Sequence, residues 1–157
     1  MKTTAARLLD RLKIAYELRE YAYEEDELDA LSAAAKMGIP PEHLFKTLVL
    51  WGDRTGPLMA CVPAAAELDL KALAAHSGNK RTEMVPVKDL PGLTGYQRGG
   101  VSPLGVKKRC PVFVDESALE IDCLSVSAGR RGLQLVLSGR DLIRATGATV
   151  VPLSRKP

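Results

Sequence analysis

The sequence contains few aromatic residues, few cysteines and no long apolar run. Aromatic residues make up 4% of the 157 residues, which argues against a surface that binds single-stranded nucleic acid mainly by stacking bases. The three cysteines form no CxxC pair, so we expect a reduced, cytoplasmic protein rather than a disulfide framework. We find neither a signal-peptide core nor an apolar run of membrane-spanning length, and expect no membrane partner.

The sequence also lacks the common motifs of metal, nucleotide and hydrolase sites. Its two histidines, His43 and His76, are far apart and have no metal-ligand spacing with a cysteine. No Walker loop, GxGxxG, HExxH or GxSxG is present. Cys61 and Cys123 lie in apolar strand-like runs, where burial makes a thiol inert, and Cys110 has no histidine nearby. We expect no metal, no cofactor and no cysteine nucleophile.

What is present is an ordinary globular composition, with 46% hydrophobic and 26% charged residues. The length suits one domain covering residues 1–157. A formal net charge of +3 is too small to establish a nucleic-acid partner by itself. Two basic clusters follow glycine-containing loops, and they are either solvated loop edges or contacts for an anionic partner. They comprise Lys107, Lys108 and Arg109, and Arg130 and Arg131.

Hydrophobic periodicity and capping residues predict a mixture of helices and hairpin-joined strands. Regular strand–helix alternation is absent, so we expect a mixed α/β fold with a curved, mostly antiparallel, barrel-like sheet and helices packed outside. A helix capped by Thr4 and a helix capped by Asp69 illustrate the pattern. The predicted helices cover residues 5–12, 28–37, 70–76 and 139–147, and the predicted strands cover residues 16–23, 44–51, 57–64, 110–116, 121–129, 132–139 and 148–153.

A lysine lies near the start of the apolar strand predicted over residues 44–51. Alternation places Phe45, Thr47 and Val49 on one face and Lys46 with two leucines on the other. Both faces are apolar, which predicts a central strand with Lys46 directed towards an interior or a cleft. The alternative is a strand-end lysine whose stem follows the surface until its ammonium reaches water.

Two glycine-containing loops are the other candidate elements. Residues 99–103 read GGVSP, in which paired glycines permit close backbone approach to a ligand and proline fixes the far end. Residues 127–132 read SAGRRG and could present amides and arginines to a phosphate. Each could equally be an ordinary sharp loop or a tight hairpin turn.

Taken together and in order, FKTLVL, TGYQRGGVSPLG and SAGRRGL resemble the YbaK family of aminoacyl-tRNA deacylases, which is related to the editing domain of bacterial prolyl-tRNA synthetases. The resemblance covers essentially the whole chain, and it is greatest to the free-standing members that act on Cys-tRNA(Pro). It implies a curved sheet around a small pocket that receives the 3′ end of an aminoacyl-tRNA. It also implies that the substrate's own thiol attacks its carbonyl, with prolyl-tRNA synthetase as a candidate partner and no DNA partner.

The resemblance assigns roles to particular residues. It implies that Lys46 is the essential catalytic lysine and that the Gly99 backbone helps to hold the aminoacyl group. The implied substrate-binding residues are Tyr21, Thr47, Gly100, Ser102, Pro103, Ser127 and Gly129. The two basic clusters are the expected tRNA-binding residues.

Two positions depart from the family pattern and concern substrate preference. Asp29 stands where close relatives carry phenylalanine, and Gln134 stands where they carry aspartate. A deacylase for another small amino acid, such as Ala-tRNA(Pro), is therefore an alternative. A non-catalytic module that binds tRNA ends or a synthetase is a second alternative, although such a module would not need an inward-facing lysine.

Overall fold

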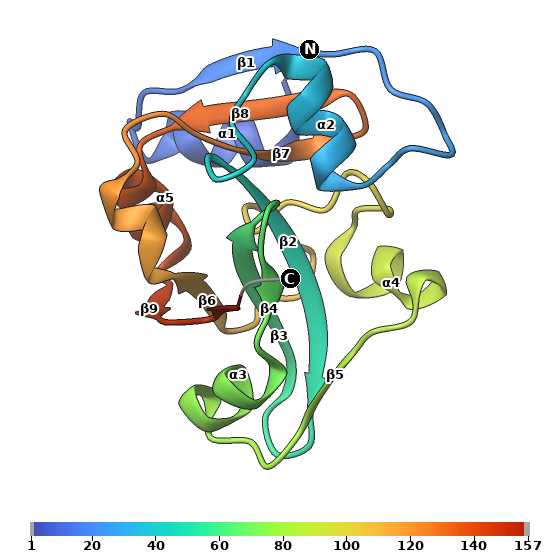
Figure 1. The fold of residues 1–157 in the computed structure, drawn as a ribbon, viewed down its shortest axis with the longest axis vertical. Helices are drawn as coiled ribbons and strands as arrows, with labels where there is room; N and C mark the ends of the chain where they lie inside the picture. Colours follow the sequence, from blue (N-terminus) through green and yellow to red (C-terminus); the bar gives the residue numbers. More distant parts are fainter. Residues whose placement is uncertain (1, 156–157) are drawn as a thin grey trace.

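The computed structural model describes residues 2–155 as a mixed sheet with helices around it (Figure 1). The strand order is β1-β8-β7-β2-β3-β6-β9, and β5 adds to β2. A second, two-stranded sheet joins β4 and β10. The strands are β1 (Glu17–Glu20), β2 (Leu44–Gly52), β3 (Gly56–Pro63), β4 (Glu67–Leu68), β5 (Thr82–Met84), β6 (Val112–Asp115), β7 (Leu124–Arg130), β8 (Leu133–Leu137), β9 (Thr149–Val151) and β10 (Ser154–Arg155).

Five short α-helices surround these strands. Three of them begin at an acid or hydroxyl N-cap and end at a glycine in the left-handed region: Asp29 and Gly38, Asp69 and Gly78, and Ser138 and Gly147. The helices are α1 (Thr4–Arg11), α2 (Ala30–Met37), α3 (Leu70–Ser77), α4 (Leu90–Thr94) and α5 (Gly139–Thr146), with 3₁₀ turns at Val87–Asp89 and Glu116–Glu120.

Strand β2 is central, as predicted, and both of its faces are buried. Phe45 and Val49 belong to the main core under α1 and α5, whereas Leu50 belongs to a second core that includes Leu73 of α3. The tight turn after β2 returns the chain antiparallel into β3 in register from Phe45–Pro63 to Gly52–Gly56. The mixed α/β class and the β2–β3 hairpin are therefore confirmed.

Several local predictions were wrong. The first helix is capped by Thr3, whose hydroxyl accepts from the Ala6 amide, not by Thr4. The strand predicted over residues 16–23 is restricted to β1, because only these residues pair with β8. Cys123 is exposed and precedes β7, so it is not a core residue. The short elements β5 and α4 were missed, because β5 forms by pairing with the distant strand β2 and α4 is a helix of only five residues that contains proline and glycine.

Candidate functional site

The functional site begins with an interruption in the pairing of β2. On one edge, Leu44 and Phe45 pair with β7, and residues 50–52 pair with β5. Between these contacts, residues 46–48 have no strand partner on that edge within the described chain. The backbone amide and carbonyl of Thr47 face this gap, because strand groups alternate in direction and the carbonyl of Val49 accepts from Val85 on the same edge.

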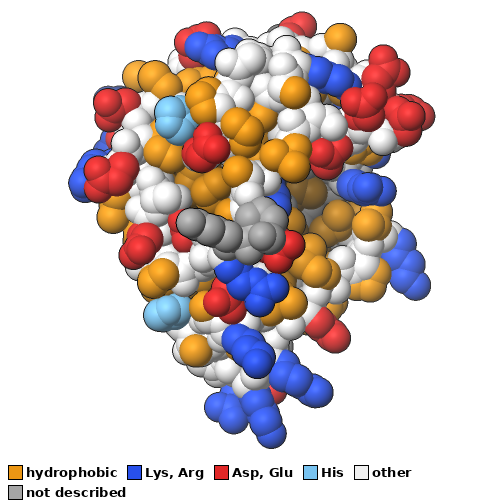
Figure 2. All heavy atoms as spheres, viewed as in Figure 1, with side chains coloured by type: hydrophobic (Ala, Val, Ile, Leu, Met, Phe, Trp, Pro, Cys, Tyr) orange, Lys and Arg blue, Asp and Glu red, His pale blue; other side chains and the backbone are white. Residues whose placement is uncertain are grey.

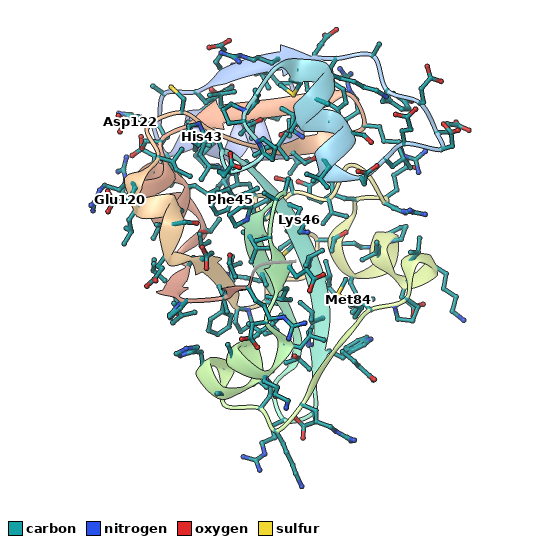
Figure 3. All side chains as sticks on the ribbon, in the orientation of Figure 1. His43, Phe45, Lys46, Met84, Glu120 and Asp122 are labelled. Carbon is teal, nitrogen blue, oxygen red and sulfur yellow. The ribbon has the colours of Figure 1, made fainter. Side chains whose placement is uncertain are left out.

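A cavity of about 390 Å³ occupies the gap, within the size range of small-ligand sites. Because it opens at a strand edge, residues from both faces of β2 reach it, including Lys46 and Thr47. Figure 3 shows Lys46 on β2 just below α2, with Met84 farther along the same side. The other lining residues come from the residue that follows β1, from α2, β7 and β8, and from the segments around α4, and they are mostly apolar.

Lys46 is half-buried, and no carboxylate of residues 2–155 lies within ion-pair distance of its ammonium. Burial lowers its pKa, and the carboxylate of Glu67 on β4 partly opposes that shift. Glu67 itself pairs with Arg155 across the small sheet at 3.3 Å. The lysine is thus an uncompensated donor on the wall of an apolar cavity, where its interaction with an oxyanion is weakly screened.

Polar groups from β2, β7 and β8 gather on another wall. Ser127 and Gln134 pair across the β7–β8 ladder, and both line the cavity with Thr47. The hydroxyl of Ser125 donates to the side-chain carbonyl of Gln134 at 2.8 Å, which fixes that amide. Tyr21 lies at the same wall, and burial raises its pKa. Together these groups offer hydrogen bonds to a small polar ligand.

The loop around Gly99 closes the cavity opposite β2. Gly99 has φ +86°, and a Cβ built there would lie 3.1 Å from the Leu28 side chain. Gly100 packs against the β7–β8 turn, since its Cβ would lie 3.0 Å from the Arg131 amide nitrogen. The guanidinium Nε of Arg131 donates to the carbonyl of Arg98 at 2.9 Å and ties the loop to that turn. The glycines therefore let the loop approach both neighbours.

Four predicted substrate-binding residues do not line the cavity in the described chain. Ser102 is fully buried, and its hydroxyl accepts from the Leu104 amide. Pro103 is buried beside it, and Gly100 packs against the backbone of Arg130 and Arg131 in the β7–β8 turn. Gly129 has φ +100°, and its missing side chain makes room for the Tyr96 ring. These residues shape the loops that carry Gly99 and Ser127.

The predicted tRNA-binding residues lie outside the cavity, at two places. Lys108 and Arg109 line a separate hollow of about 130 Å³ together with Thr55 of the β2–β3 turn. Lys107 lies in the same loop, directly before Lys108, and its backbone amide donates to the Thr94 carbonyl. Arg130 and Arg131 stand at the β7–β8 turn, where Arg130 lies 3.9 Å from Glu20.

Sequence reasoning missed several lining residues. Arg98 lies beside Gly99 and is a second cation at the cavity. Leu31, Met84 and Val87 line it while more than half exposed, and so form an apolar rim. Adjacency to the glycine loop was the one sequence signal for Arg98. Asp29 also lines the cavity, but its carboxylate caps α2 by accepting from the amide and hydroxyl of Ser32.

Other classes of site have little support in residues 2–155. No group of three or more histidine, cysteine or acidic side chains could hold a metal ion there. No helix in that range has the length and apolar character needed to cross a bilayer. Burial raises the pKa of Cys61 to about 12 and also raises that of Cys110, so neither is an activated thiol.

Comparison with known proteins gives concordant matches. The model of the aminoacyl-tRNA editing domain matches residues 24–145. EbsC of Enterococcus faecalis, provisionally named a Cys-tRNA(Pro)/Cys-tRNA(Cys) deacylase, is 43% identical over 155 residues, covering 99% of this chain and 94% of EbsC.

Solved structures agree in fold. The hypothetical protein APE2540 superposes with a TM-score of 0.88 at 23% identity, covering 98% of this chain and 100% of that one. A protein provisionally described as a trans-editing enzyme for prolyl-tRNA synthetase superposes with a TM-score of 0.83 at 23% identity, covering 99% of both chains.

Proposed function

Because the chain belongs to the aminoacyl-tRNA editing domain family, we propose that it is a deacylase that removes cysteine from mischarged Cys-tRNA(Pro) and from Cys-tRNA(Cys). The observation that carries the proposal is the position of Lys46: an ammonium without a carboxylate partner on the wall of a cavity of suitable size. A module that only holds tRNA ends has no use for such a group inside an apolar cavity.

The proposed reaction uses the thiol of the substrate itself. The cysteinyl Sγ forms a bond to the ester carbonyl carbon, the C–O bond to the terminal ribose breaks, and the thiol proton passes to the departing ribose oxygen. Water then opens the resulting thiolactone to free cysteine. Lys46 stabilises the negative charge that develops on the carbonyl oxygen, and such a preorganised donor contributes about 100- to 1,000-fold in rate.

The polar wall and the glycine loop position the cysteinyl group for this step. Ser127 and the backbone of Thr47 offer hydrogen bonds to the amino acid, while the Gly99 loop limits its length on the opposite side. A folded cysteinyl conformation brings Sγ close to its own carbonyl, and such positioning accounts for much of the acceleration in intramolecular reactions. The basic clusters at residues 107–109 and 130–131 contact the tRNA outside the cavity.

Deacylation of a panel of charged tRNAs tests the proposal. Single-turnover release of amino acid from Cys-, Ser- and Ala-tRNA(Pro) should be fast only for the cysteinyl ester, because serine lacks the thiol and alanine lacks any side-chain nucleophile. Turnover of Ser-tRNA equal to that of Cys-tRNA would exclude the substrate-thiol step, and preferred turnover of Ala-tRNA(Pro) would change the assigned substrate. Repeating the assay with prolyl-tRNA synthetase present tests whether that enzyme is a partner.

A further inference from the structure

A cluster of cations at the far end of β2 lies outside the site described above. Arg54 lies in the β2–β3 turn, Lys80 and Arg81 precede β5, and Lys71 lies on α3. All four side chains are exposed, and none lies within 4 Å of a carboxylate in residues 2–155. Figure 2 shows Lys and Arg side chains gathered at this lower end, on the face that is hollowed near its centre. We call these four residues the basic tip.

Side-chain-to-backbone hydrogen bonds hold the β2–β3 turn against the turn that precedes β5. The carboxylate of Asp53 accepts from the amides of Lys80 and Arg81, both at 2.9 Å. The side-chain oxygen Oδ1 of the buried residue Asn79 accepts from the backbone amides of Arg54 and Thr55 at 2.9 and 3.0 Å. Two turns that are more than twenty residues apart are thereby joined, and their cationic side chains extend from a fixed base.

The local charge is positive even after the neighbouring acids are counted. Asp53 and Glu83 are the acidic residues of the two turns and β5, and Asp69 caps the helix that carries Lys71, so four cations against three carboxylates leave a net charge of about +1 at neutral pH. The Asp53 carboxylate is engaged by backbone amides, which lower its pKa. The Asp53 carboxylate forms no ion pair with a cation of the basic tip, so it does not neutralise one directly.

The basic tip is connected to the cavity by two strands. From Arg81 the chain continues through β5 to Met84 at the cavity rim, a span of about 10 Å at the usual rise per residue. β2 runs from Thr47 on the cavity wall to Gly52, a span of about 17 Å, and Arg54 lies in the turn that follows. A polyanion whose end occupies the cavity and whose backbone follows the exposed strand β5 would pass over these cations.

We propose that the basic tip binds the phosphate backbone of the acceptor stem of the same tRNA whose aminoacylated 3′ end enters the cavity. This inference rests on the proposed function. The partner is identified by its chemistry: exposed, unpaired arginines and lysines on a rigid base match phosphate oxygens. A protein partner with an acidic surface is the competing occupant, and it would leave direct tRNA binding unchanged.

The triple variant Arg54→Gln, Lys80→Gln, Arg81→Gln tests the proposal. Its matched control is Arg7→Gln, Arg11→Gln, Arg140→Gln, which removes three exposed cations from α1 and α5. Binding of uncharged tRNA is measured by fluorescence anisotropy between 50 and 300 mM salt. The tip variant should bind about 10- to 100-fold more weakly at 0.1 M salt, with the salt slope reduced by roughly 2–3, whereas the control should resemble the parent.

Deacylation of two substrates separates this inference from the proposed function. The tip variant should lose kcat/KM through a raised KM on full-length Cys-tRNA(Pro), yet cleave a cysteinyl ester of a CCA trinucleotide at the parent rate. If the parent cleaves neither substrate, the proposed function fails and the binding experiment still decides the inference. Parent-like affinity and salt slope in the tip variant, or equal losses in the control, would overturn the inference.

Discussion

Gly99 gives the sharpest structural prediction about the cavity. Its φ of +86° places it in a region that costs an L-residue about 1–2 kcal/mol. The 3.1 Å approach of a built Cβ to Leu28 adds crowding against a side chain that lies between the loop and α2. We therefore expect Gly99→Ala to destabilise the protein by about 1–3 kcal/mol and to shift the loop away from the substrate. A displacement approaching 1 Å would cost up to about 100-fold in deacylation rate.

Urea unfolding and single-turnover deacylation measure the two effects separately. Gly92→Ala is the matched control, because Gly92 has no positive φ and open space at its Cβ, and it should be stabilised by about 0.5–1 kcal/mol. Adding Leu28→Ala to Gly99→Ala removes the contacts with the Leu28 Cγ and Cδ2 but keeps the Leu28 Cβ at 3.1 Å, so the crowding is relieved only in part and the backbone strain remains. A double-mutant cycle should therefore give about 0.5 kcal/mol of coupling. Stability and activity of Gly99→Ala equal to those of Gly92→Ala would refute this reasoning.

Three further predictions concern charge and thiols. Hydrogen bonds from Ser117 and from the Leu153 and Ser154 amides outweigh burial and lower the pKa of Asp115, so its stabilisation is present above about pH 4 and is lost as pH falls through the lowered value. Asp115→Asn should cost roughly 2–3 kcal/mol in urea unfolding at pH 7, and this cost should shrink as the pH is lowered progressively below about 4, whereas a cost independent of pH would contradict this. Glu67→Gln should lower the Lys46 pKa further, so background-corrected activity should fall at lower pH than in the parent; an unmoved alkaline limb would exclude the coupling. Replacing all three cysteines by alanine should retain activity, with a stability loss of about 1–2 kcal/mol; an inactive but folded protein would indicate a protein thiol.

Turn sequences and capping residues correctly predicted the hairpin and the helix whose ends depend on neighbouring residues. The β2–β3 hairpin follows from two apolar runs around GDRTG, and Asp69 and Gly78 cap α3 at the predicted places. β1 was overextended because Tyr16 and Tyr23 continue an apolar alternation without strand partners to pair with. Alternation alone cannot reveal where pairing stops, since that depends on the position of a distant strand.

The cavity itself depends on such long-range pairing. β7 meets β2 only at Leu44 and Phe45, some eighty residues away in sequence, and leaves the edge at Lys46 open. The sequence placed Lys46 and Thr47 on opposite faces, which is correct, but it could not show that an edge opening brings both to one cavity. Capping of α2 by Asp29 also escaped prediction, because the helix was expected to begin at Leu28.

The most direct test of the central claim is single-turnover deacylation of Cys-tRNA(Pro) by the parent and by Lys46→Met. Methionine keeps most of the apolar stem and removes the ammonium, and no carboxylate in residues 2–155 loses an ion pair. The account predicts an unchanged or slightly higher midpoint of thermal unfolding and a rate about 100- to 1,000-fold lower. A folded Lys46→Met protein that deacylates Cys-tRNA(Pro) at the parent rate would contradict it.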